Sequence, residues 1–267
     1  MGDAGEFGMI ELRTVKVTRY VTPLREGGSL PAIVEADDDG MYVLKFRGAG
    51  QGPKALIAEL ISGEIARALG FRVPEIVFAD LDVELSRTEP DPEIQDLLKA
   101  SAGSNLGLDY LPGSITFDPV VDRIDGQLAS EIVWFDAFIT NVDRTARNSN
   151  MLMWHKELWL IDHGASLYFQ HSWENWEEQS RKPFAPIAQH ILLSFADDLE
   201  GADERIRQKL RSDLFAKIVS FIPETWLEAE GSEADEKRAV YAEFLRQRLA
   251  NSEIFLGEAR RAREALV

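Results

Sequence analysis

The sequence predicts an α+β fold, with a small antiparallel sheet and one helix in the first part of the chain and mainly helices in the last part. Three observations indicate this fold. Alternating and apolar segments within residues 11–46 have the period of β-strands, whereas segments beyond residue 187 have helical apolar spacing. Between them, residues 141–164 contain two short apolar runs separated by a turn, with acidic and amide residues at both ends.

Composition narrows the class of protein. The chain has 267 residues, 45% of them hydrophobic, which is enough for one large domain or two lobes. Its net charge of −17 disfavours non-specific binding to nucleic acids or anionic membranes. There is no cysteine, and the four histidines lack metal-ligand spacing, so disulfides, thiolate chemistry and a zinc site are not expected. No apolar run approaches the length of a membrane span, and the expected location is the cytoplasm.

The first eight residues have neither the basic nor the apolar region of a signal peptide. We interpret residues 1–8 as an artificial leader ahead of a native start at Met9.

Three strands are expected at the start of the fold, at residues 11–20, 32–34 and 41–46. The connection between the first two contains Gly27 and Gly28, whose backbone N–H groups could cover phosphates. A plain surface loop is an equally good interpretation, because the spacing is not Gly-x-Gly-x-x-Gly.

Lys45 lies in the third apolar strand, where it is either an edge residue or a buried cation that needs partners. Residues 55–69 have the spacing of an amphipathic helix ended by Gly70. On this helix Glu59 flanks the apolar stripe, and Glu64 falls near the solvent stripe.

The remaining elements follow from local pattern. Further strands are expected at 73–79 and 105–113, separated by an acidic excursion with a short helix at 94–98. Residues 166–186 are aromatic and irregular. The expected helices of the second half are 127–139, 189–196, 203–221, 236–250 and 252–266.

The segment 141–164 contains the main candidate site residues. Residues 151–154 and 158–161 form a predicted hairpin, which brings its two ends together. Asp143 and Asn148 precede the hairpin and Asp162 follows it, so the three side chains should converge. One carboxylate, a second carboxylate and an amide suit phosphoryl transfer, in which a hydroxyl loses its proton and magnesium is held against nucleotide phosphates.

This order, Asp-x-x-x-x-Asn, a hairpin and then Ile-Asp-x-Gly, resembles the catalytic and metal-binding segments of protein-kinase-like enzymes. The Asp-Arg opening and the Ile-Asp-His-Gly sequence are most similar to the HipA-like kinases and, more distantly, the phosphatidylinositol kinases. The resemblance implies a two-lobed protein-kinase-like fold, with an N-lobe at 9–111 and a C-lobe at 112–267. ATP and Mg²⁺ are the implied cofactors.

The resemblance also implies roles for single residues. Lys45 would contact the α- and β-phosphates and pair with Glu59, the first residue of E-L-I-S-G-E-I-A-R-A-L-G-F-R-V-P. Asp143 would orient or deprotonate the acceptor hydroxyl. Asn148 and Asp162 would hold magnesium, and backbone groups near Asp109, Tyr110 and Leu111 would bind the adenine edge.

Some positions depart from the family pattern. Thr145 stands where a histidine is common, and His163 stands where Asp-Phe-Gly has its phenylalanine. Asn150 competes with Asn148 as a ligand, although the five-residue step from Asp143 favours Asn148. The role of Arg144 is open, between support of the loop and of the transferred phosphate. Because room for the extra N-terminal domain of HipA toxins is lacking, a toxin role, an antitoxin partner and DNA association are not carried over.

The expected function is that of a serine/threonine protein kinase, moving the ATP γ-phosphate to a hydroxyl acceptor of unknown identity. One alternative is a small-molecule or lipid head-group kinase on the same fold. Another is a nucleotide-binding pseudokinase or scaffold. A third is an ordinary α+β domain in which Asp143 and Asp162 cap turns.

Overall fold

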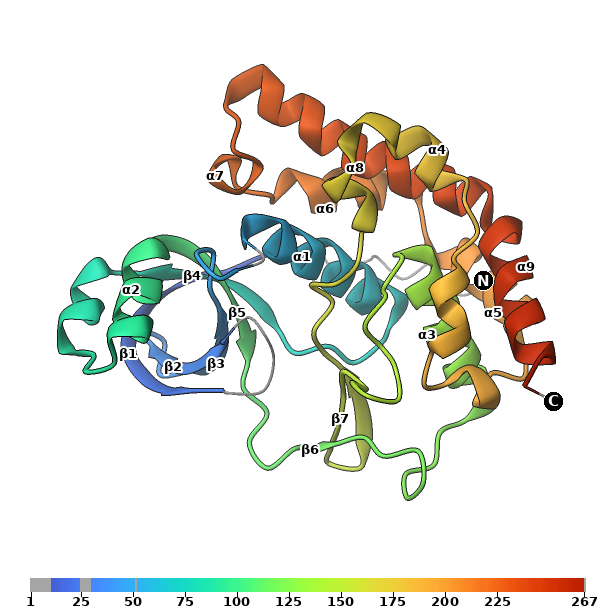
Figure 1. Ribbon diagram of the computed structural model, residues 1–267, viewed down its shortest axis with the longest axis horizontal. Coiled ribbons are helices and arrows are strands. Elements are labelled where there is room, and N and C mark those ends of the chain that lie inside the picture. The colour runs from blue at the N-terminus through green and yellow to red at the C-terminus, as the bar shows by residue number, and fades with distance from the viewer. Residues whose placement is uncertain (1–10, 25–29, 51, 267) are drawn as a thin grey trace, which may run out of the picture. The chain divides into compact units, whose positions relative to one another are not determined.

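The structure is a computed structural model that describes residues 11–24, 30–50 and 52–266. The chain divides into two compact units (Figure 1). The first unit comprises Met1–Gly52 and Glu75–Tyr110, and the second comprises Pro53–Pro74 and Leu111–Val267. The sequence led us to expect one lobe at 9–111, whereas the segment 53–74 groups with the second unit in the structure.

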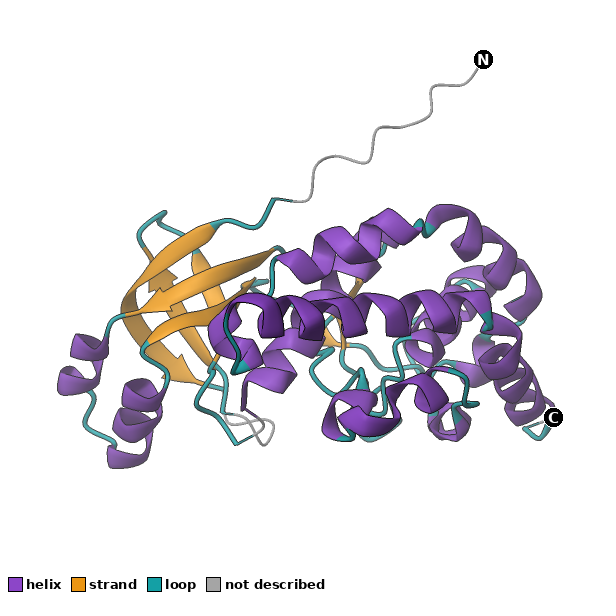
Figure 2. Cartoon of the chain, turned by 90° about the horizontal axis from the view of Figure 1, so that it is seen from above, coloured by secondary structure: helices purple, strands orange, loops and turns teal. Residues whose placement is uncertain are grey.

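The first unit is built on a closed five-stranded sheet of strand order β1-β2-β3-β5-β4 (Figure 2). Its strands are β1 (Thr14–Pro23), β2 (Ala32–Ala36), β3 (Met41–Lys45), β4 (Ile76–Leu81) and β5 (Gly103–Asp109). The antiparallel arrangement of the first three strands is confirmed. A wholly antiparallel sheet was a wrong expectation, because β1 also pairs with β4 in parallel, with Thr14 opposite Phe78. That pairing closes the sheet.

The interior of this closed sheet is filled by apolar side chains and is closely packed. The inward side chains include Val15, Val34 and Leu44, all nearly inaccessible to solvent. At Gly107 of β5, an added Cβ would lie 2.9 Å from a methyl carbon of Val77, so no larger residue fits without a shift. A short 3₁₀ helix, η1 (Val83–Thr88), and α2 (Pro92–Ala100) form the predicted excursion between β4 and β5.

The first helix, α1 (Gly52–Leu69), does not have the exposed face that its sequence suggested. Every residue from Leu56 to Ala66 is buried, including Glu64, which is 3% exposed. The solvent position expected for Glu64 is therefore wrong. Its carboxylate lies 3.2 Å from the Arg67 guanidinium, one turn further along the helix.

A small antiparallel sheet in the second unit contains the predicted hairpin. Its strands are β6 (Ile115–Thr116), β7 (Met151–Trp154) and β8 (Glu157–Leu160), in that order. The hairpin of β7 and β8 is confirmed. Its turn uses His155 and Lys156, with φ angles of 50° and 68°, the left-handed pair that suits a two-residue hairpin. The two-residue strand β6 is too short to leave a periodic signal in the sequence.

Helices make up most of the rest of the second unit, as predicted. The longer ones are α3 (Gly126–Phe138), α5 (Leu199–Lys209), α6 (Ser212–Ser220), α8 (Gly231–Ala250) and α9 (Ser252–Glu264), with the single turns α4 (Trp176–Ser180) and α7 (Glu224–Leu227). The 3₁₀ turns are η2 (Tyr168–His171), η3 (Trp173–Asn175), η4 (Ala185–Gln189) and η5 (Leu193–Phe195). None of the helices in the described part of the chain is long and apolar enough to cross a membrane.

Two helix predictions in this half were wrong. The helix expected at 203–221 is interrupted, because Leu210 and Arg211 adopt extended backbone between α5 and α6. Leu210 is 5% exposed, so burial of its side chain accompanies the break. The helix expected at 189–196 is replaced by η4 and η5. Tertiary packing overrides local spacing at both places.

The core of the second unit is aromatic and centres on α3. Trp134 stacks on Phe138 with ring centroids 5.3 Å apart, and Phe255 of α9 meets the Trp134 ring edge-on at 5.1 Å. Phe215 of α6 lies 6.0 Å from Phe138. Because α3 is covered in this way, its C-terminal end, which leads into the loop with Asp143, has a fixed position.

Arg248 of α8 ties this end of α3 to the following segment. It is 1% exposed, and its guanidinium donates to the Ala137 and Phe138 carbonyls at 2.6 and 2.7 Å and to the Lys182 carbonyl at 3.2 Å. The cation also lies over the Phe255 ring, at 4.8 Å. Burial lowers the pKa of Arg248 to about 9, and carbonyls at a helix C-terminus, where the dipole is negative, offset part of that cost.

We expect Arg248→Met to lower the free energy of unfolding by about 3 kcal/mol, because several buried carbonyls lose their donor together. Urea denaturation of the two proteins measures the difference. Arg246→Met, at a half-exposed neighbour on the same helix, is the control and should change it by less than about 0.5 kcal/mol. An equal effect of the two substitutions would contradict the anchoring role of Arg248.

Candidate functional site

The hairpin brings the loop that precedes it beside the segment that follows it. The Ile161 N–H donates to the Asn150 carbonyl at 3.1 Å, and the Val142 N–H donates to the Ala165 carbonyl at 3.3 Å. These two bonds flank Asp143 on one segment and Asp162 on the other. The predicted convergence of the two ends is therefore present within the second unit.

Amide groups hold Asp143 on several sides. The Asn148 amide donates to Asp143 Oδ2 at 2.9 Å, and the Asn150 amide donates to the Asp143 carbonyl at 3.0 Å. The Asp143 N–H in turn donates to Asn141 Oδ1 at 3.1 Å. Since the side-chain bonds fall on Oδ2, the half-buried carboxylate keeps Oδ1 as a further acceptor.

Asn148 and Asn150 have different surroundings. Asn148 is exposed, and because its Nδ2 donates to Asp143, its Oδ1 remains as a ligand atom. Asn150 is 6% exposed and bonds to the loop itself. Backbone bonds in both directions between Thr145 and Asn148, at 2.8 and 3.2 Å, close the loop. Asn148 is thus the better placed of the two to hold a metal, and Asn150 stabilises the loop.

A buried carboxylate from α3, Asp136, lies beneath this loop. It is fully buried and accepts from Arg144 Nε at 2.5 Å, His190 Nε2 at 2.8 Å and Asn141 Nδ2 at 2.9 Å. Arg144 is 1% exposed and also donates to the Asn150 carbonyl. Of the two roles left open for Arg144, its burial favours support of the loop.

Electrostatics keep Asp136 ionised despite its burial. Burial alone would raise the pKa of Asp136, but the Arg144 cation and the hydrogen bonds from His190 and Asn141 outweigh it, so the pKa lies well below its usual range. The Leu192 N–H donates to His190 Nδ1 at 3.0 Å. The His190 proton is therefore on Nε2, where it is donated to Asp136.

Thr145, which stands where the family commonly has a histidine, is held by the segment near residue 190. The residue pairs with His190 in an antiparallel bridge, and the Ile191 N–H donates to the Arg144 carbonyl at 3.1 Å. The loop is thus supported by His190, which lies 45 residues after Thr145 in the sequence.

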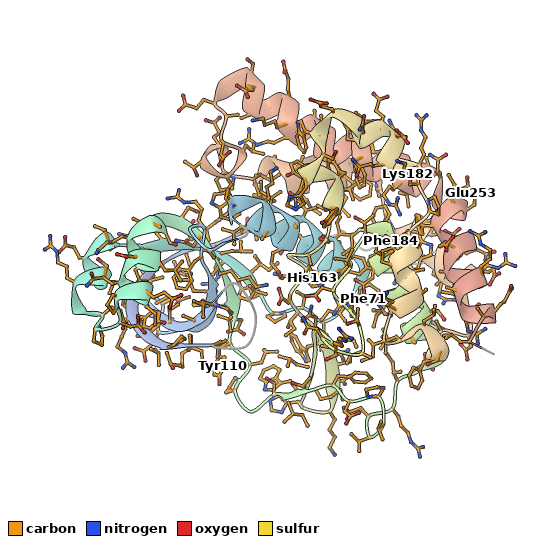
Figure 3. The ribbon with its side chains drawn as sticks, in the orientation of Figure 1. Phe71, Tyr110, His163, Lys182, Phe184 and Glu253 are labelled. Atoms are coloured by element: carbon orange, nitrogen blue, oxygen red, sulfur yellow. The ribbon has the colours of Figure 1, made fainter. Side chains whose placement is uncertain are left out.

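Asp162 and His163 differ in their exposure to solvent. Asp162 has a left-handed φ of 57° and an exposed side chain, whereas His163 is fully buried in the second unit (Figure 3). His163 Nδ1 lies 3.3 Å from Oε1 of Glu59, which is also fully buried. The second unit therefore brings Glu59, Asp143, Asn148 and Asp162 to the same group of segments.

The other predicted site residues belong to other segments of the chain. Lys45 is a partly buried residue at the end of β3, opposite Leu106, in the first unit. Gly27 and Gly28 lie outside the described residues. The Asp109 N–H donates to the Glu75 carbonyl and the Tyr110 N–H donates to the Met41 carbonyl, both at 2.9 Å.

The backbone N–H groups of Asp109 and Tyr110 already donate to other backbone carbonyls. These two N–H groups are therefore not available as donors to an adenine ring. Burial, followed by the nearby Glu75 carboxylate, raises the pKa of Asp109. Leu111, the third predicted adenine contact, is buried and is the first residue of the longer segment of the second unit.

The sequence reasoning missed Asp136, Asn141 and His190. Asp136 had a usable signal, because an acidic residue in the apolar run Ile132–Ile139 must have buried partners. His190 had none, since its link to Asp136 spans 54 residues. Within the described residues, no group of three or more histidine, cysteine or acidic side chains could hold a metal ion.

We expect Asp136→Asn to destabilise the protein by about 3–5 kcal/mol, because an amide N–H would face donors and Arg144 would lose its counter-charge. Because the folded pKa of Asp136 is below the unfolded value of about 4, its contribution is complete above pH 4 and is lost as the pH falls through the folded pKa. The variant should therefore unfold less steeply with acid than the wild type.

Denaturant curves at several pH values measure both effects. Asp213→Asn, at a side chain that is 72% exposed, is the control and should be nearly neutral. A stable Asp136→Asn protein with unchanged acid sensitivity would contradict the role of Asp136.

Comparisons with solved structures show the fold. A proinflammatory kinase, CtkA, from Helicobacter pylori has 15% identity and a TM-score of 0.54, with 95% of this chain and 99% of that chain covered. The Golgi casein kinase, solved with Mn/ADP bound, has 12% identity and a TM-score of 0.48, with 95% and 74% covered. No curated protein has a significantly similar sequence.

The family comparison covers almost the whole fold. Residues 17–255 match the family described as HipA-like kinase, a range that contains most of the closed sheet and the whole hairpin with Asp143 and Asp162. The family expected from the motif order is confirmed. This chain belongs to the HipA-like kinase family.

Proposed function

We propose that the protein is an ATP- and Mg²⁺-dependent phosphotransferase that moves the γ-phosphate to a serine or threonine hydroxyl of a protein. The observation that supports this most is the state of Asp143, whose Oδ2 accepts the Asn148 amide at 2.9 Å while Oδ1 keeps its acceptor capacity. A carboxylate held in this way suits the orientation of an acceptor hydroxyl and removal of its proton.

The loop limits how Asp143 can move. Asn141 and Asn150 hold its backbone N–H and carbonyl. The Asn148 and Asn150 amides both donate to Oδ2, so rotation of the carboxylate requires these two bonds to break. A base held in position before the acceptor arrives reduces the entropy cost of the reactive geometry. In this mechanism Oδ1 takes the hydroxyl proton, and Asn148 keeps Oδ2 in place.

We assign Asn148 Oδ1 and the Asp162 carboxylate to Mg²⁺. Both side chains are exposed, and both offer the oxygen atoms that this hard cation prefers. Bound Mg²⁺ would neutralise charge on the nucleotide phosphates. The buried Asn150 is not assigned to the metal, because its amide holds Asp143.

We assign the remaining predicted residues to the nucleotide. Lys45 would bind the α- and β-phosphates, and Glu59 would orient that lysine. Backbone groups at Leu111 are the candidate for the adenine edge, and the Gly27 and Gly28 segment remains a candidate for covering the phosphates.

The acceptor is proposed as a protein hydroxyl in the cytoplasm. A net charge of −17 disfavours a polyanionic acceptor such as a nucleic acid or an anionic lipid surface. Small-molecule phosphorylation uses the same residues, so it is separated from protein phosphorylation by experiment.

Substitution of the two carboxylates should separate binding from transfer. We expect Asp162→Ala to abolish magnesium-dependent binding or turnover of ATP, and Asp143→Ala to retain nucleotide binding while transfer falls by about 10²- to 10⁴-fold. Calorimetry with ATP and Mg²⁺ measures the first effect and labelled-phosphate transfer the second. Asp235→Ala, at a side chain that is 77% exposed, serves as the control.

The phosphate acceptor can be identified directly. The purified protein is incubated with labelled ATP and Mg²⁺ in a cell extract that has been separated into proteins, small metabolites and lipids. We expect the label in proteins, on serine or threonine, as mass spectrometry can establish. Label in metabolites or lipids would instead support the alternative kinases. ATP binding without any transfer would support a pseudokinase.

A further inference from the structure

Helix α1 is attached to the segment after the hairpin by a row of side-chain bonds. Lys54 Nζ donates to the Gln170 carbonyl at 2.8 Å, Glu59 Oε1 lies 3.3 Å from His163 Nδ1, and the Ser62 and Ser166 hydroxyls are 2.7 Å apart. Glu59 and Ser62 are three residues apart and so share one face of the helix. The bond between Glu59 and His163 is the member of this row that joins two residues of the candidate site.

The chemistry of this contact determines the tautomer of His163. An ionised carboxylate accepts hydrogen bonds and donates none, so a bond to Glu59 Oε1 requires the proton on His163 Nδ1. His163 Nε2 is buried and has no hydrogen-bond partner among the described residues. A ring with its proton on Nδ1 therefore donates to Glu59.

The neighbours of His163 fix the plane of its ring. Phe135 of α3 meets the imidazole edge-on, with centroids 6.0 Å apart and an interplanar angle of 74°. Phe71, beyond the end of α1, lies 5.6 Å from Phe135 and extends this packing (Figure 3). The imidazole thus has little freedom to turn away from Glu59.

Gly164 also lies against α1. A Cβ at this position would be in ordinary van der Waals contact with the Ala55 carbonyl oxygen, at 3.4 Å, and with Glu59 Oε2, at 3.7 Å. Both residues that follow Asp162 therefore lie beside Glu59.

We propose that His163 is a positioning residue for Glu59, which it holds in one orientation through Nδ1–H beside the metal-binding segment. The inference rests on the nucleotide role proposed above for Glu59. Because His163 directly follows Asp162, the position of the helix glutamate and that of the metal ligand are linked through one peptide. A phenylalanine at this place could only pack.

Two substitutions distinguish positioning from packing. His163→Asn keeps an N–H donor at about the place of Nδ1, whereas His163→Leu keeps apolar bulk and removes the donor. With Mg·ATP as the substrate and ADP release as the readout, we expect kcat to fall about 10- to 100-fold in His163→Leu. The KM for ATP should change much less, and His163→Asn should recover most of kcat. His155→Asn, at the exposed hairpin turn where asparagine tolerates the left-handed backbone, is the matched control.

A second measurement does not depend on turnover. In protein labelled with ¹⁵N-histidine, which has four imidazoles, the His163 signals are assigned by their loss in His163→Asn. We expect the signals of a ring with its proton on Nδ1, and we expect Glu59→Gln to shift them. Thermal unfolding of each variant shows whether it is folded under assay conditions.

The outcomes distinguish the positioning role of His163 from the proposed phosphotransferase function. Wild-type kcat in His163→Leu, equal losses in the leucine and asparagine variants, or a His163 proton on Nε2 would each overturn the positioning role. A folded wild-type protein without ADP release would overturn the proposed function, and the imidazole spectrum would still test the Glu59 contact.

Discussion

The candidate site depends on one buried charge, the Asp136 carboxylate. A lone carboxylate in this interior would be protonated or would destabilise the fold, so its three donors are a requirement of its burial. The donors come from Asn141 and Arg144 in the loop and from His190, far along the chain. The hydrogen bonds to Asp136 therefore hold the loop and the segment near residue 190 against the end of α3. The hydrogen bonds to Asp136, seven residues earlier, therefore help to fix the position of Asp143.

Backbone conformation around the site indicates that the same contacts also stabilise an otherwise unfavourable chain path. Thr140, Asn150 and Asp162 have φ angles of 56°, 47° and 57°, in the left-handed region that costs L-residues about 1–2 kcal/mol each. These residues lie before the loop, before the hairpin and after it. Asparagine and aspartate tolerate this conformation better than most residues, but threonine does not. Such conformations persist where the surroundings determine them, here through the bonds to Asp136, Asp143 and the hairpin backbone.

The parts that could be predicted from the sequence are those set by local rules. Apolar runs around a short turn identified the hairpin, and the five-residue step from Asp143 to Asn148 identified a pair that the structure joins by a hydrogen bond. Tertiary packing determined what local rules could not. The burial of Glu64, the break at Leu210 and the bond from His190 to Asp136 all depend on residues distant in sequence.

The departure at His163 has a physical consequence beyond a change of residue type. Phenylalanine and histidine both fill space beneath a helix, but the imidazole also offers a directed N–H to a buried acid. Glu59 is fully buried, and His163 lies within hydrogen-bond distance of it in the same unit. Asp162, in the left-handed region, is exposed, whereas His163 is buried. Ile-Asp-His-Gly is therefore best understood together with the helix glutamate. In the proposed mechanism this short turn supplies both a metal ligand, Asp162, and the residue that positions Glu59, His163.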